Sequence, residues 1–286
     1  MGLTGRHKII IAVAVSYFIT LFVSTHIPIP KIVYKAGVSD KWLHFLAYMN
    51  LFFLLWFSVF NDKKANWRKL AVWLIFLGAI ICGGIDELSQ PYTGRTCDFW
   101  DFTADAKGVS AGLIIVTFLT FRPSLLAVWA VSIFGVATLI KADLSKVAPI
   151  LDTVYHVLAY AGFTLIWTQL INLYLSPKTI INRLLTMISV PLGLMLFVKA
   201  SSMLLGRYFT TAEMLLSGGA VIAAATATCL FARKGIRNLF WERGYKGGRQ
   251  SASFARSKTV VCGRMPRRGI CRRLIRRRTP QGPGTR

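Results

Sequence analysis

The sequence predicts an all-α protein, a polytopic transmembrane helical bundle of about eight helices. The first observation is composition, because 54% of the 286 residues are hydrophobic and only 16% are charged, whereas a soluble domain carries about a quarter charged residues. The second observation is that apolar runs recur between residues 9 and 231, each close to the roughly 20 residues that cross a bilayer core. Helices are expected because backbone groups in lipid must bond to one another.

Eight apolar runs approach the length of a membrane span. They lie at residues 9–24, 42–60, 69–85, 106–121, 124–140, 153–175, 184–202 and 213–231. The first run has no small-residue cleavage site after it, so we expect a retained span rather than a signal peptide. Short basic loops at 61–68, 122–123 and 176–183 are typical of the cytoplasmic side. Outside the tail, Lys and Arg are equally frequent on the two sides. The basic tail decides the orientation, and with the even number of spans and the Arg6 and Lys8 flank it predicts that both termini are cytoplasmic.

A shift of 112 residues aligns two halves of the chain without gaps. Segment 40–48 then falls on 152–160, with Asp, His and Leu-Ala-Tyr in common, and Gly94-Arg95 falls on Gly206-Arg207. Because each half has an even number of spans, the halves would be parallel repeats with the same orientation. We therefore predict two parallel four-helix repeats, a first half at 1–121 and a degenerate second half at 122–231.

Residues 232–286 form a third predicted segment, a basic and disordered cytoplasmic tail. This segment holds 17 of the 35 Lys and Arg residues and a single acid, Glu242, so most of the net charge of +24 lies there. Such a segment can bind anionic lipids or nucleic acid. We assign it no function, and we predict membrane lipids, but no nucleic acid, as partners of the chain.

The candidate functional residues gather around the connection between the third and fourth runs. Residues 86–105 contain five acids, and ionisable groups close to lipid suggest function because they are costly there. Spacings of three and four residues would place a polar set on one helical face, namely Glu87, Gln90, Asp98, Asp101 and Asp105. The last three precede or open the fourth run, where helix capping is an alternative role. Gly108 and Gly112 extend this face as a small-residue strip for helix packing.

Three further polar residues could act with these acids. Arg95 could pair internally with Glu87 or Asp101, or bind a ligand carboxylate or phosphate. His44, one turn beyond Asp40, could be an acid/base group, a metal ligand, or an interface histidine bonded to a carboxylate. The five cysteines lie far apart without a CxxC pair, so we expect free thiols. We predict no metal and no cofactor.

Several of these residues form motifs that resemble a known family. Asp40-Lys-x-x-His44-Phe-x-x-Tyr48, Glu87-x-x-Gln90, and Gly94-Arg95 followed by Asp98, Asp101, Asp105, Gly108 and Gly112 resemble the VanZ-like membrane protein family, named for a glycopeptide (teicoplanin) resistance protein. The resemblance covers about residues 9–121, returns as an echo in the second half and stops before the tail. Asp105 departs from the Asn that is common in the family. The resemblance implies a protein of the bacterial cytoplasmic (inner) membrane, linked in some members to teicoplanin-type resistance, and it implies no reaction.

Three functions are compatible with these residues. The first is a non-enzymatic envelope protein that recognises or moves an anionic lipid-linked cell-wall precursor at the outer membrane face through Arg95 and the carboxylates. The second is a membrane-embedded lipid-phosphate hydrolase or transferase that uses Glu87, Asp98, Asp101 and His44, with or without a divalent cation. The third is a purely structural bundle. We favour the first and leave enzymatic activity open, because the sequence shows no nucleophile with a base partner.

Overall fold

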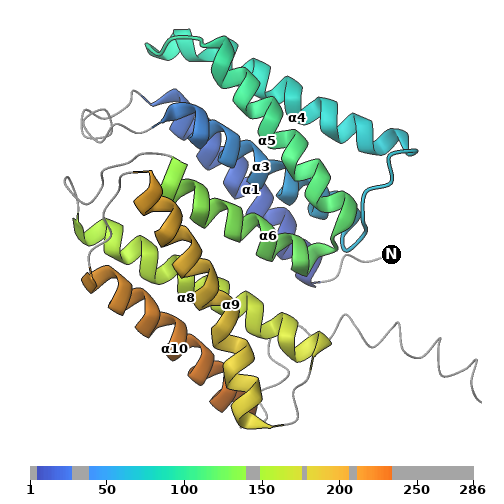
Figure 1. The fold of residues 1–286 in the computed structure, drawn as a ribbon. Coiled ribbons are helices and arrows are strands. Elements are labelled where there is room, and N and C mark those ends of the chain that lie inside the picture. The colour runs from blue at the N-terminus through green and yellow to red at the C-terminus, as the bar shows by residue number, and fades with distance from the viewer. Residues whose placement is uncertain (1–4, 28–38, 140–148, 176–178, 206–210, 234–286) are drawn as a thin grey trace, which may run out of the picture. The chain divides into compact units, whose positions relative to one another are not determined.

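The computed structural model describes residues 5–27, 39–139, 149–175, 179–205 and 211–233, and the regular structure in these ranges is helical throughout. The α-helices are α1 (Gly5–His26), α3 (Asp40–Phe60), α4 (Leu70–Ser89), α5 (Phe99–Phe118), α6 (Phe121–Phe134), α8 (Pro149–Tyr174), α9 (Ile180–Leu204) and α10 (Thr211–Arg233) (Figure 1). Two short helical turns, η1 (Gln90–Thr93) and η2 (Gly135–Leu139), extend α4 and α6. The prediction of an all-α protein is confirmed.

The chain divides into two compact units, Met1–Gly244 and Tyr245–Arg286. All of the described helices belong to the first unit. The predicted tail, apart from the last two residues of α10, lies outside the described residues, as does the Gly206-Arg207 pair of the expected repeat.

Seven helices in the described part of the chain are long and apolar enough to cross a membrane. They are Gly5–His26, Asp40–Phe60, Leu70–Thr93, Phe121–Thr138, Asp152–Tyr174, Ile180–Leu204 and Thr211–Phe231. Their outward surfaces are apolar as well, with large exposed side chains such as Ile9, Leu74 and Leu185. A surface of this kind is costly in water and suits lipid. The helices therefore indicate a multi-pass membrane protein.

Helix α5 is the eighth long helix and differs from the others in carrying three charged residues, Asp101, Asp105 and Lys107. It begins at Phe99, several residues before the apolar run predicted at 106–121, so two of these charges lie inside the helix rather than before it. At its far end, the backbone N–H of Ala65 donates to the carbonyl of Val116 at 2.9 Å. Ala65 belongs to the loop that follows α3. Helix α5 therefore extends from the start of α3 to beyond its end.

Exposed aromatic side chains mark both ends of these helices. Trp42, Tyr92, Phe99 and Trp100 are exposed around the end where α4 connects to α5, and Trp67 and Trp73 are exposed at the opposite end. Aromatic rings of this kind gather at membrane interfaces. The opposite end also carries the basic loop residues Lys63, Lys64, Arg68 and Lys69, which suits the side that the sequence predicts to be cytoplasmic.

Helix α3 lies at the centre of the first four helices and packs against α1, α4, α5 and α6. Its aromatic residues Phe52, Trp56 and Phe57 are completely buried or nearly so. The closest approach is to α5, where a Cβ atom added at Gly108 would lie 2.3 Å from the carbonyl oxygen of Phe45 and one at Gly112 would lie 3.0 Å from the side chain of Phe52. The two helix backbones can approach this closely only because these positions lack side chains.

Substitution of Gly108 tests this close approach. We expect Gly108→Ala to lower the free energy of unfolding by about 1–3 kcal/mol, the usual cost of overpacking, because the new methyl group would collide with the backbone of α3. Gly78→Ala in α4 is the matched control, since a Cβ there meets nothing within 4 Å. Thermal unfolding of the two purified variants in detergent makes the comparison. Equal stability would show that α3 and α5 do not approach at Gly108.

Candidate functional site

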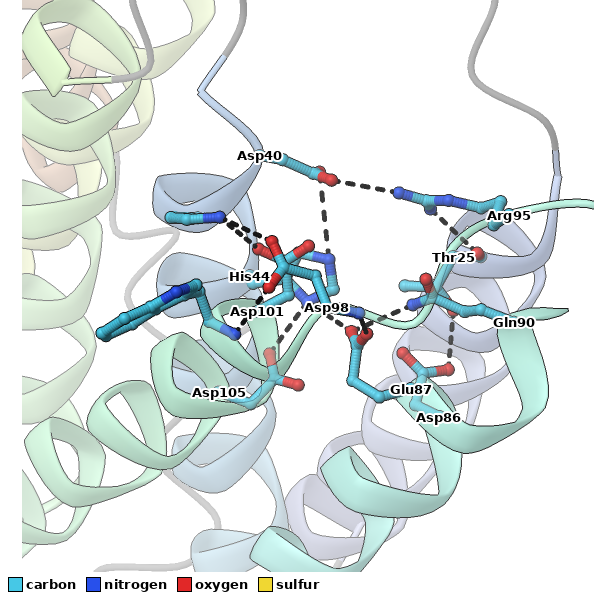
Figure 2. A network of polar contacts seen from close by, with 12 residues as sticks. Thr25, Asp40, His44, Asp86, Glu87, Gln90, Arg95, Asp98, Asp101 and Asp105 are labelled. Carbon is cyan, nitrogen blue, oxygen red and sulfur yellow. Dashed lines mark hydrogen bonds and ion pairs between the residues drawn. The ribbon is translucent and has the colours of Figure 1, made fainter.

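The polar candidates meet at the end of the first four helices where α4 connects to α5 (Figure 2). Asp40 and His44 come from the start of α3, Glu87 from the end of α4, and Gln90 from η1. The chain then turns at Gly94, whose φ of +81° is left-handed and suits glycine. This turn brings Arg95 and the first residues of α5, including Asp101 and Asp105, back over the ends of α3 and α4.

The outer part of the site is a set of ion pairs around Lys41. Its ammonium group lies 2.9 Å from Asp98 Oδ2 and 3.3 Å from Asp101 Oδ1. Asp98 also caps α5, because its Oδ1 accepts a hydrogen bond of 2.8 Å from the backbone N–H of Trp100. Lys41 and this N–H hold the pKa of Asp98 below its ordinary value. Capping, which the sequence left open for three acids, is therefore observed for Asp98.

Lys41 was not among the residues singled out in the sequence. The available signal was its position, since a cation in the first turn of a helix is unfavourable next to the positive end of the helix dipole. A lysine in such a place is expected to have an acidic partner, and here it has two. The sequence could not show that these partners lie 57 and 60 positions further along the chain.

Arg95 pairs with a different carboxylate from the ones expected. Its Nη2 donates to Asp40 Oδ2 at 3.1 Å and its Nη1 donates to the carbonyl oxygen of Thr25 at 2.8 Å. The expectation that its internal partner would be Glu87 or Asp101 is wrong. The loop from Gly94 directs the guanidinium away from α4 and across the start of α3 and the end of α1 (Figure 2). Arg95 thus ties three chain segments together.

The inner part of the site lies beneath these pairs and is centred on His44. The ring Nδ1 lies 3.0 Å from Asp105 Oδ1 and 3.6 Å from Glu87 Oε1. All three side chains are buried, with 4%, 2% and 0% exposure for His44, Glu87 and Asp105. The amide of Gln90 donates to Glu87 Oε1 at 3.0 Å, and the backbone N–H of Asp98 donates to Oε2 at 3.3 Å. Glu87 is therefore oriented by two donors.

A third group of contacts joins the end of α1 to α4, and it includes a histidine that the sequence did not indicate. Thr25 donates its hydroxyl to Asp86 Oδ1 at 2.7 Å, and His26 Nε2 lies 2.8 Å from Ser89 Oγ. The other ring nitrogen, Nδ1, lies 2.7 Å from the carbonyl oxygen of Phe22. Because a carbonyl oxygen only accepts, Nδ1 carries the proton in the neutral ring and Nε2 is free to accept from Ser89.

Two sets of residues in the described part of the chain have the geometry to hold a metal ion. The ligand atoms lie within 4.8 Å of one another in the set Asp40, His44 and Asp101 and in the set His44, Glu87 and Asp105. His44 belongs to both sets, and its Nε2 faces Asp40 whereas its Nδ1 faces Glu87 and Asp105. The described cysteines, Cys82, Cys97 and Cys229, are free and belong to neither set.

Comparison with known proteins gives no match to this chain. No family model fits it, and no curated protein or solved structure is significantly similar to it. The resemblance to the VanZ-like family accordingly rests on the motifs quoted above. The chemistry of the site has to be argued from its own geometry.

The contacts of Arg95 predict a specific loss of stability. We expect Arg95→Ala to lower the free energy of unfolding by about 1–3 kcal/mol, because a buried carbonyl loses its charged donor. Asp40→Asn should cost clearly less, since Arg95 keeps its bond to the carbonyl of Thr25 and the pair with Asp40 is partly exposed. Thermal unfolding in detergent measures both variants. An Asp40→Asn variant as unstable as Arg95→Ala would contradict this division of roles.

Proposed function

We propose that the chain is an envelope protein of the bacterial cytoplasmic membrane that binds a lipid-linked cell-wall precursor at the outer membrane face without catalysing a reaction. The observation that carries the proposal is the charge of the site. Six carboxylates meet there, from Asp40, Asp86, Glu87, Asp98, Asp101 and Asp105, against the basic side chains of Lys41, Arg95 and His44. An excess of acids favours ligands that present amine or sugar hydroxyl groups.

The accessible part of the site supports binding from the water side of the membrane. The side chains of Lys41, Asp98 and Asp40 are 52%, 39% and 38% exposed, and exposed aromatic rings surround them. Arg95 contributes less than the sequence suggested to recognition of a ligand phosphate or carboxylate, because Asp40 and the carbonyl of Thr25 already engage its guanidinium. The carboxylates are thus the groups proposed to contact the ligand.

The proposed orientation places the site outside the cell and both termini in the cytoplasm. The opposite end of the first four helices carries the short basic loop after α3, which favours the cytoplasmic side. The resemblance to the VanZ-like family supports the same membrane. No further partner is proposed beyond membrane lipids and the lipid-linked precursor.

Native cysteines can test this orientation without added labels. Cys97 is exposed at the site, whereas Cys262 and Cys271 belong to the proposed cytoplasmic tail. We expect a membrane-impermeant maleimide to modify Cys97 in intact spheroplasts and the tail cysteines only after permeabilisation, as read by mass spectrometry of the peptides. Cys97→Ser is the control. Modification of the tail cysteines alone in intact spheroplasts would reverse the orientation.

We also propose that the two halves are parallel repeats related by the shift of 112 residues. Two hydrogen bonds support this. Tyr17 donates to the carbonyl of Ala47 at 3.1 Å, and Trp129 donates to the carbonyl of Ala159 at 3.0 Å. The two donors are 112 positions apart, and so are the two acceptors. The helix contacts are also alike, since α8 packs against α6, α9 and α10 as α3 packs against α1, α4 and α5.

The hydrolase alternative is favoured by one contact, that between His26 and Ser89. A hydroxyl facing a neutral imidazole nitrogen is the arrangement of an activated nucleophile. The same hydroxyl, however, lies 2.7 Å and 2.8 Å from the carbonyl oxygens of Ile85 and Asp86. These oxygens, in the same helix, accept its hydrogen bond. Ser89 therefore has local acceptors, and binding is the function that the site supports better.

Teicoplanin susceptibility of a susceptible host that expresses the protein tests both functions. We expect the wild type to raise resistance and Asp98→Asn to lose the effect at equal abundance in the membrane. This substitution removes a charge while keeping a good capping residue, so its loss would reflect ligand contact rather than unfolding. Ser89→Ala should retain resistance, because binding needs no hydroxyl there.

The matched control is Asp62→Asn, which removes a carboxylate charge at the opposite end of the same helices. Asp62 accepts a hydrogen bond from the backbone N–H of Phe121, and an Asn side chain can still accept it. If Ser89→Ala loses resistance at normal abundance, the hydrolase reading replaces binding. If Asp98→Asn and Asp62→Asn behave as the wild type does, the outer carboxylates are not a ligand site.

A further inference from the structure

We propose that His44, Glu87 and Asp105 bind one divalent first-row transition-metal ion beneath the outer ion pairs. The three side chains come from α3, α4 and α5 and meet where all of them are buried. Their ligand atoms lie within 4.8 Å of one another. This inference stands independently of the proposed envelope function, because it concerns the inner carboxylates and not the exposed ones.

The distances suit a metal centre. His44 Nδ1 lies 3.0 Å from Asp105 Oδ1 and 3.6 Å from Glu87 Oε1. Ligand atoms that share one ion at metal–ligand distances of about 2.0–2.2 Å lie roughly 3.0–3.5 Å from one another. Two of the three separations are therefore already close to those around a shared ion. Three protein ligands would leave a position open, as in many catalytic zinc sites.

The distribution of charge distinguishes this set from its neighbour. In the set Asp40, His44 and Asp101, each carboxylate already pairs with a basic side chain, Asp40 with Arg95 and Asp101 with Lys41. In the described part of the chain, the ion pairs of Glu87 and Asp105 are with His44 alone. On binding an ion, His44 would release its proton. The neutral imidazole and two carboxylates would then carry a charge of −2, which a divalent cation would neutralise.

An unpartnered oxygen is a second and independent indication of a ligand. Asp105 is completely buried, and its Oδ2 has no hydrogen-bond partner. Burial of a carboxylate oxygen without a partner is costly. Oδ2 also lies 3.1 Å from the place that a Cβ at Gly83 would occupy, so α4 closes the site on this side. A cation held by both oxygens of Asp105 would satisfy Oδ2.

Outer contacts orient the ligands in the way that is usual around protein-bound metals. Gln90 donates to Glu87 Oε1, and the second ring nitrogen of His44 faces Asp40 Oδ1 at 3.9 Å. A carboxylate that accepts the second N–H of a ligating histidine fixes its tautomer, and Asp40 would have to approach by a few tenths of an ångström to do so. The mixed nitrogen and oxygen ligands favour Zn(II), Fe(II) or Mn(II), whereas Mg(II) and Ca(II) prefer oxygen alone.

Metal binding by the full-length protein in detergent tests the proposal. After treatment with a chelator, the protein is titrated with Zn(II) or with Mn(II), desalted, and analysed by elemental mass spectrometry and by thermal unfolding. We expect one ion per chain and a Tm that rises with ion concentration, with no such effect of Mg(II). Gln90→Ala should weaken affinity by about 10–100-fold and the ligand substitutions Glu87→Gln and Asp105→Asn by more than about 100-fold.

Asp62→Asn is the matched control and should bind the ion as the wild type does, since Asp62 lies at the opposite end of the first four helices and an Asn there can still accept from the backbone N–H of Phe121. If the folded wild type takes up no ion, the proposal is wrong and protons balance the inner carboxylates. Equal uptake by wild type, Glu87→Gln and Asp105→Asn would show that the ion binds elsewhere, which also overturns the proposal.

Should Asp105→Asn fail to fold, the uptake of the ion by Glu87→Gln decides alone. Metal uptake without teicoplanin resistance would reject the envelope function and leave this site in place.

Discussion

The desolvation of carboxylates at the end of a membrane bundle is the constraint on which the rest of this structure depends. Removing an ionised carboxylate from water costs several kcal/mol, by order of magnitude, unless partners are supplied. Four buried carboxylates, Asp86, Glu87, Asp101 and Asp105, meet here beside the partly exposed Asp40 and Asp98. Many of their partners come from other helices. Lys41 of α3 reaches the start of α5, and Arg95 joins α3 to the end of α1. The need for partners thus sets how the four helix ends are arranged.

Close helix packing makes these contacts possible. Gly108 brings α5 against the backbone of α3 at Phe45, which is the residue after His44. The distance of 3.0 Å between His44 and Asp105 depends on this approach, because a bulkier residue at position 108 would separate the two helices. Gly83 plays the same part for α4, whose backbone lies against the carboxyl group of Asp105. Small residues on two helices therefore determine the geometry of the buried polar groups.

The sequence predicts the helices well and the partners of the charged residues poorly. Hydrophobic runs of spanning length locate the α-helices because lipid requires both apolar side chains and paired backbone groups. The start of α5 was missed, since Asp101 and Asp105 interrupt the apolar pattern although both are buried in the helix. The polar cluster was also predicted, because its residues are close in sequence or at helical spacing. The pairs of Lys41 with Asp98 and of His26 with Ser89 were not, since no local pattern links residues 57 and 63 positions apart.

The second half helps to separate structural from functional residues if the proposed repeat is correct. It keeps a buried histidine beside an aspartate one turn earlier, with His156 Nε2 3.7 Å from Asp152 Oδ1, as His44 Nε2 lies 3.9 Å from Asp40 Oδ1. The positions that correspond to Glu87 and Asp105 are instead occupied by Lys199 and Ser217. A pair that both halves keep is explained by packing of the α3 and α8 helices. The two acids found in one half alone are not needed for that packing. Within the structure His44 is their ion-pair partner, and the divalent cation that we propose would balance the two acids once His44 has lost its proton.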